Sequence, residues 1–600
     1  MGIQKIYFIT VLFNAIFIYS LLGQITPPVW HNVIPRQNLT QEQKNVILQS
    51  LAQYESEYDA NVSMIKRNYT YHEGMPNTNY RGHTVHETRL AADYAVDLLD
   101  CGDSRMEKRA FDVLRKLFSL QDLRPNSTTH GLWSYFLEEP LDKMASPDLN
   151  WADFIGTQLL QISINQRDRL PPDVAQGLDL AIIYAAGLIQ RRNVGLDYTN
   201  IAIMGTHVTI VTSEIYNLTD LNQYAMDRLR IFSNFTNFNG GFTEYNSPTY
   251  TVVALDELGR MKMHAIAHEV ANLTDQLYYI GWRELAQHYH RPTGQLGGPH
   301  ARSYSTLLTG DTLSFLYNSV NGTWDPRLPL PIPADLKTYF VTPLTTPRGF
   351  NRTYFRDPQH IVPDLIGTAY LHPWFTIGSI NHAEMWWQRR PLIAYWGTQA
   401  KPSFLQFRFL HDGFDFSDIV FNSVQNDGRV LAGIVFGTDG GDIFPNFNMI
   451  KNATIKAHDL RIRFDIGGND SNTTWHLPDK PTDPIKFIFN NISVQLALPI
   501  VLFSNYSQPG WNITRKNGVL SVDYVLFTSN VNETIRIDLL GQAAAIVAVQ
   551  ISDDKSAVMS PVNVSKDSLL NAKWDGLCLS SPFKPDKFSK LHVLPKFTCA

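Results

Sequence analysis

The chain changes its hydrophobic period at a proline-rich segment, residues 326–333. Before this segment, from about Gln41 to Leu316, apolar residues recur at helical spacing. After it come β-rich runs such as residues 404–409 and 519–527, the second preceded by an Asn517-Gly518 turn. Helices without intervening strands, followed by strands without intervening helices, predict two domains of different class. We expect a helical bundle or helical toroid, then an antiparallel β-sandwich.

Single elements can also be read from the sequence. Leu178 to Arg192 is almost wholly apolar until its basic end, which favours an inner helix. Thr219-Asp220 is typical of a helix start, and His268 to His288 predicts another long helix. The runs Ile485 to Val494 and Ile535 to Ile551 predict strands.

Length and composition narrow the class of protein. At 600 residues the chain exceeds the size at which one core keeps growing, so more than one domain is expected. Its net charge of −5, with both signs mixed, argues against a nucleic-acid partner. The 12 tryptophans and 26 tyrosines supply many aromatic faces, which suit sugar rings but also fill large cores.

The N-terminus predicts export. Lys5 precedes an apolar run from Ile6 to Leu22, which is the layout of a secretory signal peptide with cleavage near Gly23. A retained membrane anchor is the alternative. Seventeen Asn-x-Ser/Thr sites lie along the chain, from Asn38 to Asn563. We therefore expect residues 1–23 to be a signal peptide and the remainder to be a secreted, N-glycosylated protein without stable membrane association.

The cysteines are too few for a disulfide scaffold. Cys578 and Cys599 lie close enough in sequence to close a C-terminal loop, and an oxidising compartment permits that bond. Whether they pair is left open. Cys101 follows an apparent helix end, so a buried or unpaired thiol is expected there.

The segment 240–250, GGFTEYNSPTY, has the strongest chemical signal in the helical half. Its glycine pair permits a sharp turn, and its Ser-Pro step precedes a run that continues as a helix. Tyr250 is therefore predicted on a constrained loop beside Glu244 and Asn246. A phenol held in this way can exchange protons. The alternative is a packed loop whose tyrosine fills a groove.

Three further polar clusters are spaced by about two helices each. Asn150 and Trp151 open the first, and Asn200 opens an apolar helix forty-nine residues past Trp151. His300, Arg302 and Tyr304 share a turn fifty residues past Tyr250. This spacing is what a helical toroid needs to bring its loops onto one rim.

Together these motifs resemble the toroid-plus-sandwich polysaccharide lyases, namely the heparinase II/III-like group and the chondroitin AC/hyaluronate lyase family. Asn150-Trp151 with Asp153 is similar to the Asn-Trp-Trp-Asp/Glu cleft motif of the latter family. Glu244 with Ser247-Pro248-Thr249-Tyr250 resembles the heparinase-type Glu-x-Ser-Pro-x-Tyr signature. The resemblance implies an (α/α) toroid in residues 24–335 and a sandwich in residues 336–600.

It also implies a β-elimination that cleaves a uronic-acid-containing polysaccharide. Asn200 falls where these enzymes neutralise the substrate carboxylate, and Tyr250 falls at the catalytic tyrosine. His300 and Arg302 lie near the arginine-rich turn of the chondroitin type, and they complete the catalytic set. His382 of the sandwich is the candidate for the histidine that heparinase-type enzymes draw from that domain. Thr251 stands where heparinase-type enzymes have histidine after the tyrosine, so the identity of the base stays open.

The chemistry explains why these residue types belong together. The proton to be removed lies on C5, next to a carboxylate, and is very weakly acidic, so amide and cationic donors must withdraw charge from the carboxylate. Asn200 and Arg302, with His300, fit that role. Tyr250 fits the proton transfer, since it can serve as base and then as acid. The expected substrate contacts are Asn150, Trp151, Trp133, Tyr135, Glu244, Asn246, Tyr304 and His382.

Each candidate also has a structural explanation. Asn200 could cap the helix that follows it. His300 and Arg302 could form a structural or surface cluster, and Trp151 could be a packing residue. His207, inside an apolar helix, is interpreted as a core histidine rather than a site residue.

Two other classes of function remain open. A glycoside hydrolase on a helical toroid would need two carboxylates across a cleft, and Asp153 and Glu244 are the candidates, with Asp256 as a further option. A non-catalytic carbohydrate-binding protein would use Trp133, Trp151 and Tyr135 without an acid or base. No His-Glu-x-x-His or related ligand set occurs, so neither a metal nor a cofactor is expected in the site. Structural calcium in the sandwich cannot be judged from the sequence.

Overall fold

The computed structural model describes most of the chain. The described residues are 34, 36–71, 77–359, 361–440, 450, 452–468, 473–475, 478, 480, 482–504 and 510–591. The predicted signal peptide, residues 1–23, and Cys599 lie outside them. Cys578 is disulfide-bonded, and Cys101 is a free, buried cysteine, as expected.

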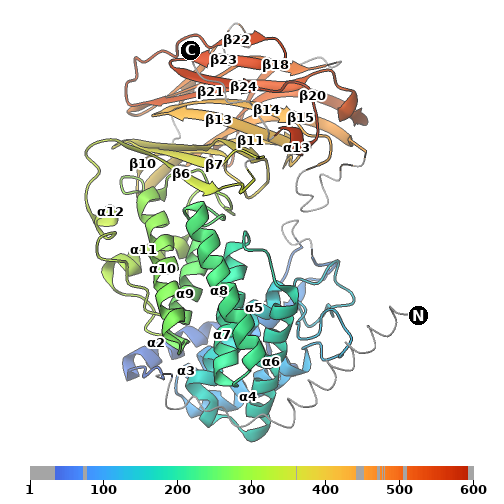
Figure 1. Cartoon of the computed structure of the whole chain (residues 1–600), viewed down its shortest axis with the longest axis vertical. Coiled ribbons are helices and arrows are strands. Elements are labelled where there is room, and N and C mark those ends of the chain that lie inside the picture. The colour runs from blue at the N-terminus through green and yellow to red at the C-terminus, as the bar shows by residue number, and fades with distance from the viewer. Residues whose placement is uncertain are drawn as a thin grey trace. The chain divides into compact units, whose positions relative to one another are not determined.

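Helices dominate the chain up to residue 321 (Figure 1). They are α2 (Gln41–Leu51), α3 (Thr88–Asp100), α4 (Ser104–Ser119), α5 (Asn150–Gln166), α6 (Pro172–Arg192), α7 (Thr199–Ile215), α8 (Thr219–Asn239), α9 (Tyr250–His264), α10 (His268–His288) and α11 (Gly310–Asn321). Two one-turn helices follow, α12 (Thr338–Val341) and α13 (Phe588–Leu591). The predicted start of α8 and both predicted ends of α10 are confirmed.

Local signals explain several helix ends. Thr40 and Gln43 form a capping box on α2, in which each side chain accepts a hydrogen bond from the other residue's amide. Pro172 stands at the first position of α6, where a missing amide proton costs nothing. The same helix ends at Asn193, which adopts the left-handed conformation with φ of 42°.

Two compact units can be distinguished by their internal contacts. The helical unit comprises residues 1–235, 254–278 and 324–330, and the strand-rich unit comprises residues 236–253, 279–323 and 331–600. Helices α8, α9 and α10 contribute residues to both units. The predicted division at residue 335 therefore stays a prediction about domain organisation.

The helical unit has its own core. Helix α5 packs against α3, α6 and α7, and α6 also packs against α4 and α7. The fully buried residues Leu98, Leu114, Leu159 and Ile182 belong to one cluster drawn from these helices. Among the described helices, α6 is long and apolar enough to cross a membrane by length and composition, yet 56% of its apolar window is buried within the structure. Its packing is that of a core helix.

A three-stranded sheet interrupts the helical half, where no strand was expected. It consists of β1 (Tyr58–Asp59), β2 (Met64–Asn68) and β3 (Thr84–His86). The strands are two to five residues long. A run that short does not display an alternating pattern in the sequence, which explains why it was missed.

Antiparallel sheets dominate the chain after residue 347 (Figure 1). The strands are β6 (Arg348–Phe355), β7 (Leu365–Leu371), β8 (Phe375–Ile380), β9 (His382–Glu384), β10 (Leu392–Thr398), β11 (Lys401–His411), β12 (Phe414–Asp415), β13 (Ile419–Asn426), β14 (Arg429–Phe436), β15 (Thr454–Gly468), β16 (Thr474–Trp475), β17 (Ile485–Phe489), β18 (Ile492–Phe503), β19 (Gly510–Lys516), β20 (Val519–Arg536), β21 (Ala543–Ser552), β22 (Asn563–Lys566), β23 (Leu570–Trp574) and β24 (Leu577–Ser581). Two-residue strands β4 (Tyr289–His290) and β5 (Gln295–Leu296) precede them. The predicted order of a helical part followed by an antiparallel sheet-rich part is confirmed.

Two sheets form the sandwich of the strand-rich unit. One has the order β19-β20-β15-β11-β10-β8-β7-β6, with β12 on β11, and the other has the order β16-β17-β18-β21-β14-β13-β9. Their inner faces share one core, in which the rings of Phe407 on β11 and Phe421 on β13 lie 5.4 Å apart. The sheet β22-β23-β24 packs on the other face of the second sheet, where Leu570 and Trp574 contact the cluster around Leu431.

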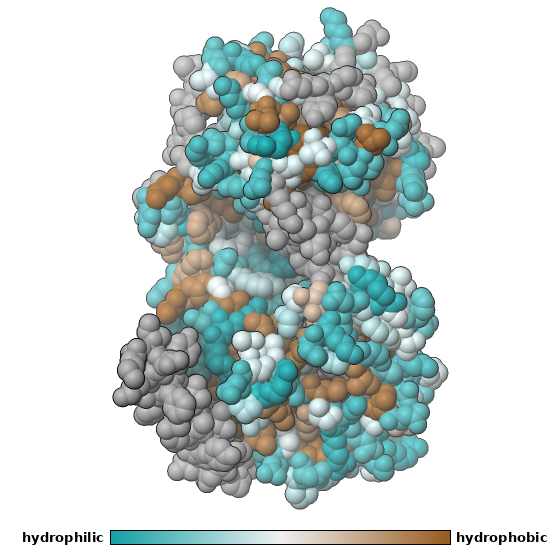
Figure 2. Space-filling view, turned by 90° about the vertical axis from the view of Figure 1, so that its right-hand side faces the viewer, coloured by the Kyte–Doolittle hydropathy of each residue, from teal (hydrophilic) through white to brown (hydrophobic). Residues whose placement is uncertain are grey.

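The Asn517-Gly518 turn joins β19 to β20, as predicted. Both residues have positive φ, 51° and 77°, which is the conformation that tight hairpins require. The predicted single strand from Ile485 to Val494 is in fact β17, a turn at residues 490–491 and the start of β18. Hydrophilic residues predominate on the face seen in Figure 2, with hydrophobic residues scattered among them, as is usual for a globular exterior.

Candidate functional site

The loop between α8 and α9 presents Tyr250 at a helix start. Gly240 ends α8 with φ of 88°, and its amide donates to Thr236 O at 2.9 Å. Ser247 Oγ accepts a hydrogen bond from the amide of Tyr250 at 3.2 Å, as an N-cap residue does, and Pro248 follows it. The Ser-Pro step of the sequence therefore fixes where α9 begins, and Tyr250 is held on its first turn.

Asn246 attaches this loop to the turn at residues 297–299. It is fully buried, with φ of 42°, and its Nδ2 donates to Gly297 O at 2.6 Å and to Pro299 O at 3.0 Å. Its amide donates to Glu284 Oε1 at 3.1 Å. Sequence analysis expected a substrate contact here. Burial and these three bonds instead assign Asn246 to positioning the loop.

The turn that carries Arg302 is joined to the segment before β10. His300 and Arg390 exchange amide-to-carbonyl hydrogen bonds of 3.1 and 3.0 Å, and Ser303 N donates to Gln388 O at 2.7 Å. Ser247 Oγ also donates to Arg302 O at 2.7 Å. These backbone contacts hold the turn, the Tyr250 loop and the segment 386–390 together.

Arg302 links the acidic, amide and phenolic side chains of the site. Its Nη1 donates to Glu244 Oε1 at 2.8 Å and its Nε donates to Gln388 Oε1 at 2.9 Å. Its Nη2 donates to Tyr250 Oη at 3.1 Å, and the guanidinium lies 4.0 Å from the centre of the Tyr250 ring. The Arg302 and Glu244 side chains are 15% and 8% exposed, so this ion pair is largely shielded from water. A charge-assisted donor thus points at the phenol oxygen.

Tyr304 provides a second contact to the same oxygen. The Tyr250 and Tyr304 hydroxyls lie 2.5 Å apart, and the ring centres lie 5.9 Å apart. Tyr304 is 48% exposed, and its ring meets Trp387 edge-to-face at 5.5 Å. The phenol pair is therefore accessible from solvent and flanked by an aromatic surface. This arrangement can pass a proton between Tyr250 and a bound molecule.

His300 differs from the sequence prediction. It is fully buried, with Nδ1 2.6 Å from Asn246 O and Nε2 3.2 Å from Tyr395 Oη. Burial lowers the pKa of His300 to about 3, so the ring is neutral at physiological pH. Both nitrogens are engaged inside the protein. His300 therefore supports the turn, and a role in proton transfer with substrate is not supported by its position.

Two of the predicted aromatic candidates of the helical unit, Trp151 and Tyr135, are in ring contact. Their ring centres lie 4.1 Å apart. Trp151 Nε1 donates a hydrogen bond to Thr88 Oγ1 at 3.1 Å, and Tyr135 Oη donates one to Asp148 Oδ2 at 2.7 Å. Asn150 begins α5, and its Nδ2 donates to Tyr198 Oη at 3.2 Å. Trp133 is 1% exposed and donates to Leu117 O at 2.9 Å. Trp133 is thus a core residue, which corrects the prediction of a substrate contact.

Asn200 is fully buried at the second position of α7. The residue that precedes α7, Tyr198, makes no side-chain capping bond. Asn200, Asn150 and Trp151 belong to the helical unit, whereas Tyr250, Arg302 and Tyr304 belong to the strand-rich unit. Convergence of all these residues on one cleft stays a prediction.

His382 lies on β9, in the seven-stranded sheet. It pairs with Asn422 of β13, and its Nε2 lies 3.0 Å from Pro363 O. Gln388, six residues further on, was not predicted, although it holds the Arg302 guanidinium. No local pattern marks it, because its role depends on the pairing of two distant segments.

Asp153, one of the two carboxylates of the hydrolase alternative, is a buried acid of the helical unit. Asp153 is 1% exposed, lies 3.5 Å from Arg192 Nη1, and has its pKa raised to about 8 by burial. Such a group resembles a core acid more than a cleft nucleophile.

His207 is fully buried and its Nδ1 lies 2.9 Å from Glu257 Oε2, which agrees with its interpretation as a core histidine. Across the described part of the chain, no group of three or more metal-ligating side chains is arranged to hold a metal ion.

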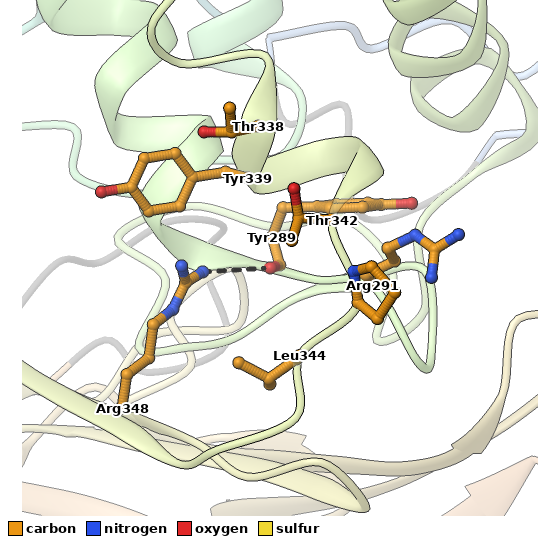
Figure 3. A pocket seen from close by; sticks show the side chains of 8 residues that line it. Tyr289, Arg291, Thr338, Tyr339, Thr342, Leu344 and Arg348 are labelled. Carbon is orange, nitrogen blue, oxygen red and sulfur yellow. Dashed lines mark hydrogen bonds between the residues drawn. The ribbon is translucent and has the colours of Figure 1, made fainter.

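A separate hollow of about 220 Å³ lies beside α12 (Figure 3). Its lining includes Arg291 and Arg348, and Arg348 donates to Gln287 O at 3.1 Å. Arg348 lies 4.7 Å from the centre of the Tyr339 ring and donates to Tyr289 O at 3.5 Å. None of the predicted site residues lines this hollow.

Comparison with known proteins gives one family match and several structural likenesses. Residues 44–320 match a family described as "Domain of unknown function (DUF8769)". No curated protein matches the sequence. The chain is similar to the Streptomyces coelicolor A3 chondroitin AC lyase in complex with chondroitin sulphate, at 10% identity and a TM-score of 0.48, over 90% of this chain and 84% of that one.

Two further solved structures are similar over most of their length. Heparinase III matches at 8% identity and a TM-score of 0.43, over 93% of both chains. The heparan sulfate lyase HepC from Pedobacter heparinus matches at 8% identity and a TM-score of 0.31, over 95% of this chain and 94% of that one.

Proposed function

We propose that the protein is a secreted polysaccharide lyase that cleaves a uronic-acid-containing polysaccharide by β-elimination. The observation that carries the proposal is the convergence of Arg302 Nη2 and the Tyr304 hydroxyl on the Tyr250 phenol oxygen, at 3.1 and 2.5 Å. Two polar neighbours on one partly exposed phenol are what a tyrosine that exchanges protons requires.

The two neighbours favour negative charge on the Tyr250 oxygen. When Tyr250 is ionised, its oxygen only accepts, so Tyr304 becomes the donor and the Arg302 guanidinium adds a charge-assisted bond. Glu244 opposes this effect but is itself paired with Arg302 at 2.8 Å. The buried Glu244–Arg302 pair also fixes the guanidinium in place, so that the donor is preorganised.

Ionised Tyr250 takes the C5 proton of a 4-linked uronate, the C5 electron pair forms a C4–C5 double bond, and the C4–O bond breaks. The protonated phenol returns that proton to the departing oxygen, which regenerates the phenolate. No water is consumed, so the product is an unsaturated uronate.

Arg302 acts on the phenol in this scheme, which changes the role expected from the sequence. Its Nε, Nη1 and Nη2 each donate to a protein acceptor, namely Gln388, Glu244 and Tyr250. The amide of Asn200 is then our candidate for neutralising the substrate carboxylate. Truncating Asn200 to alanine should lower kcat, because the carboxylate gains charge in the transition state.

Secretion and N-glycosylation belong to the same proposal. A polymer substrate of this kind is outside the cell, and the N-terminal apolar run and seventeen glycosylation sequons are consistent with an exported enzyme. The substrate is an acidic polysaccharide of the general class that heparinases and chondroitin lyases act on.

The direct experiment is a screen of uronate polysaccharides in which ultraviolet absorbance and new reducing ends are measured together. The proposal predicts that each new reducing end is accompanied by one conjugated, ultraviolet-absorbing product. New reducing ends without absorbance would identify a hydrolase. Binding without either signal would identify a carbohydrate-binding protein, and each of these two results would reject the lyase assignment.

A further inference from the structure

A second hollow borders the phenol pair and has no role in the scheme above. It has a volume of about 280 Å³. Its lining residues are Tyr304, Thr306, Trp387, Arg390, Phe404, Gln406, Arg408, Asp415, Asp465 and Val519. Because Tyr304 lines it and is also hydrogen-bonded to Tyr250, the hollow begins where the proposed reaction takes place.

The floor of this hollow is the outer face of the nine-stranded sheet. Phe404, Gln406 and Arg408 alternate along β11, so their side chains lie on one face. The intervening Leu405 and Phe407 lie in the sandwich core. A sheet held by a core on its other face gives the hollow a rigid base.

Gln406 has an unused donor in this hollow. It is 4% exposed, and its Oε1 accepts a hydrogen bond from Thr306 Oγ1 at 2.7 Å. Thr306 is held in turn, because its carbonyl accepts from Tyr395 Oη at 2.8 Å. The Gln406 Nε2 has no hydrogen-bond partner among the described residues. This Nε2 is not among the buried atoms that lack a partner, so it is open to the hollow, where a hydroxyl of a bound molecule can accept its hydrogen bond.

The charges around the hollow compensate one another. Arg408 forms a two-point pair with Asp415 at 2.9 and 2.6 Å and also donates to Asp465 at 3.1 Å. Arg390 is 5% exposed and donates to the carbonyls of Trp387 at 2.6 Å and Ser303 at 3.0 Å. Two cations thus face two carboxylates, so the hollow has no net charge to attract an anionic group.

The walls are aromatic where the hollow meets the phenol pair. Tyr304 and Trp387 meet edge-to-face with ring centres 5.5 Å apart, and both line the hollow. The apolar faces of a sugar ring pack well on such side chains, while its hydroxyls need polar partners. The volume is close to the lower end of the range for small-molecule pockets, roughly 300 Å³, which suits a single ring.

From these observations we propose that the hollow is a subsite for one uncharged hexose unit of the polysaccharide, next to the uronate that reacts. The proposal rests on the lyase function proposed above and adds its specificity: the polymer contains a neutral hexose beside the uronate. Gln406 Nε2 is assigned as donor to a hexose hydroxyl, and Tyr304 with Trp387 as the surface for the ring.

Two Gln406 variants test the subsite through kinetics. Gln406→Ala removes the amide, and Gln406→Glu keeps its shape and the acceptor for Thr306 while removing the donor. On a polymer that alternates uronate with neutral hexose, each should lower kcat/KM about tenfold, mainly through KM. On a polymer of uronate alone, neither Gln406 variant should change kcat/KM. Gln399→Ala, on the exposed β10–β11 turn, is the matched control. Equal losses on both polymers, or no loss on either, would overturn the proposal.

Direct binding separates this proposal from the lyase function. Saturation-transfer NMR with lactose as the neutral probe and glucuronate as the acidic probe does not depend on turnover. We expect a lactose signal with the wild type and with Tyr250→Phe that is lost in both Gln406 variants, which melting curves should show to be folded. A protein that eliminates no polysaccharide but shows this pattern would retain the subsite and lose the lyase assignment. An active lyase whose lactose signal is absent, or is unchanged in folded Gln406→Glu, would reject the subsite alone.

Discussion

Arg302 is the residue on which the arrangement around Tyr250 depends. Three of its nitrogens are used at once, on a carboxylate, an amide and a phenol, and its plane lies against the phenol ring. A lysine ammonium is a point charge and cannot hold three acceptors in fixed directions. The shape of the guanidinium, as well as its charge, is therefore part of the proposed mechanism.

Arg302→Ala should lower kcat by about 10²–10³, the range seen when one preorganised donor to a developing charge is removed. Arg302→Lys should recover only part of that loss, since it restores the charge without the geometry. The measurement is the initial rate of ultraviolet-absorbing product at saturating polysaccharide. Arg389→Ala is the control, because Arg389 lies in the same segment but donates to Glu384 O at 3.2 Å instead of to the phenol. A kcat for Arg302→Ala equal to that of the control would exclude Arg302 from the chemistry.

At the scale of elements, α9 begins with the tyrosine proposed to transfer protons and has a buried end. Tyr250 lies at its first position and His264 at its last, and the His264 ring is 5.9 Å from that of His207 in the helical core. His264 is 3% exposed, and neither of its ring nitrogens has a hydrogen-bond partner in the described part of the chain. Burial, with the like charges of His207 and Arg260 nearby, lowers the pKa of His264 to about 3.

This histidine makes stability depend on pH. Its pKa is about 3 when folded and 6.5 when unfolded, so between these values the unfolded chain binds more protons. Stability contributed by the neutral ring is therefore present above pH 6.5 and is lost as pH falls through that value. From pH 7 to pH 5 the loss for one such group is about 2 kcal/mol. Urea unfolding at both pH values should show a smaller drop for His264→Phe than for the wild type. An equal drop in the two proteins would contradict the assignment.

Elements that carry their own signals were predictable from the sequence. The ends of α10, the start of α8 and the Asn517-Gly518 turn follow from helix-start residues, apolar periodicity and turn chemistry, all of which are local. Short β1 to β3 were not predictable, since their pairing lies in contacts between distant residues.

Within the site too, local motifs could be read from the sequence, whereas contacts between distant residues could not. Tyr250, Glu244 and Arg302 were named from short motifs, and the structure brings these three together. His300 was misread because the turn around it pairs with residues 388–390, which buries its ring. Gln388 was missed for the same reason. Long-range backbone pairing, rather than residue type, decides which of these side chains reaches solvent.

At the scale of the whole molecule, the proposed exported enzyme has a helical part and a sheet-rich part. Sequons occur in both, including Asn68 on β2 and Asn512 on β19, and both side chains lie at accessible positions. Treating protein from its native host with an N-glycosidase should lower its apparent mass, and its N-terminus should begin near residue 24. An unchanged mass together with an N-terminus at Met1 would argue against export.

The most direct test of the central claim compares Tyr250→Phe with Tyr304→Phe in the elimination assay. Both remove one hydroxyl of the 2.5 Å pair and leave the ring packing in place. If Tyr250 transfers the proton, Tyr250→Phe should lose about 10²–10⁴ of kcat, as removal of a general acid–base group does. Tyr304→Phe, which removes only a hydrogen bond to that oxygen, should lose clearly less. A folded Tyr250→Phe protein with near-wild-type elimination would contradict the account.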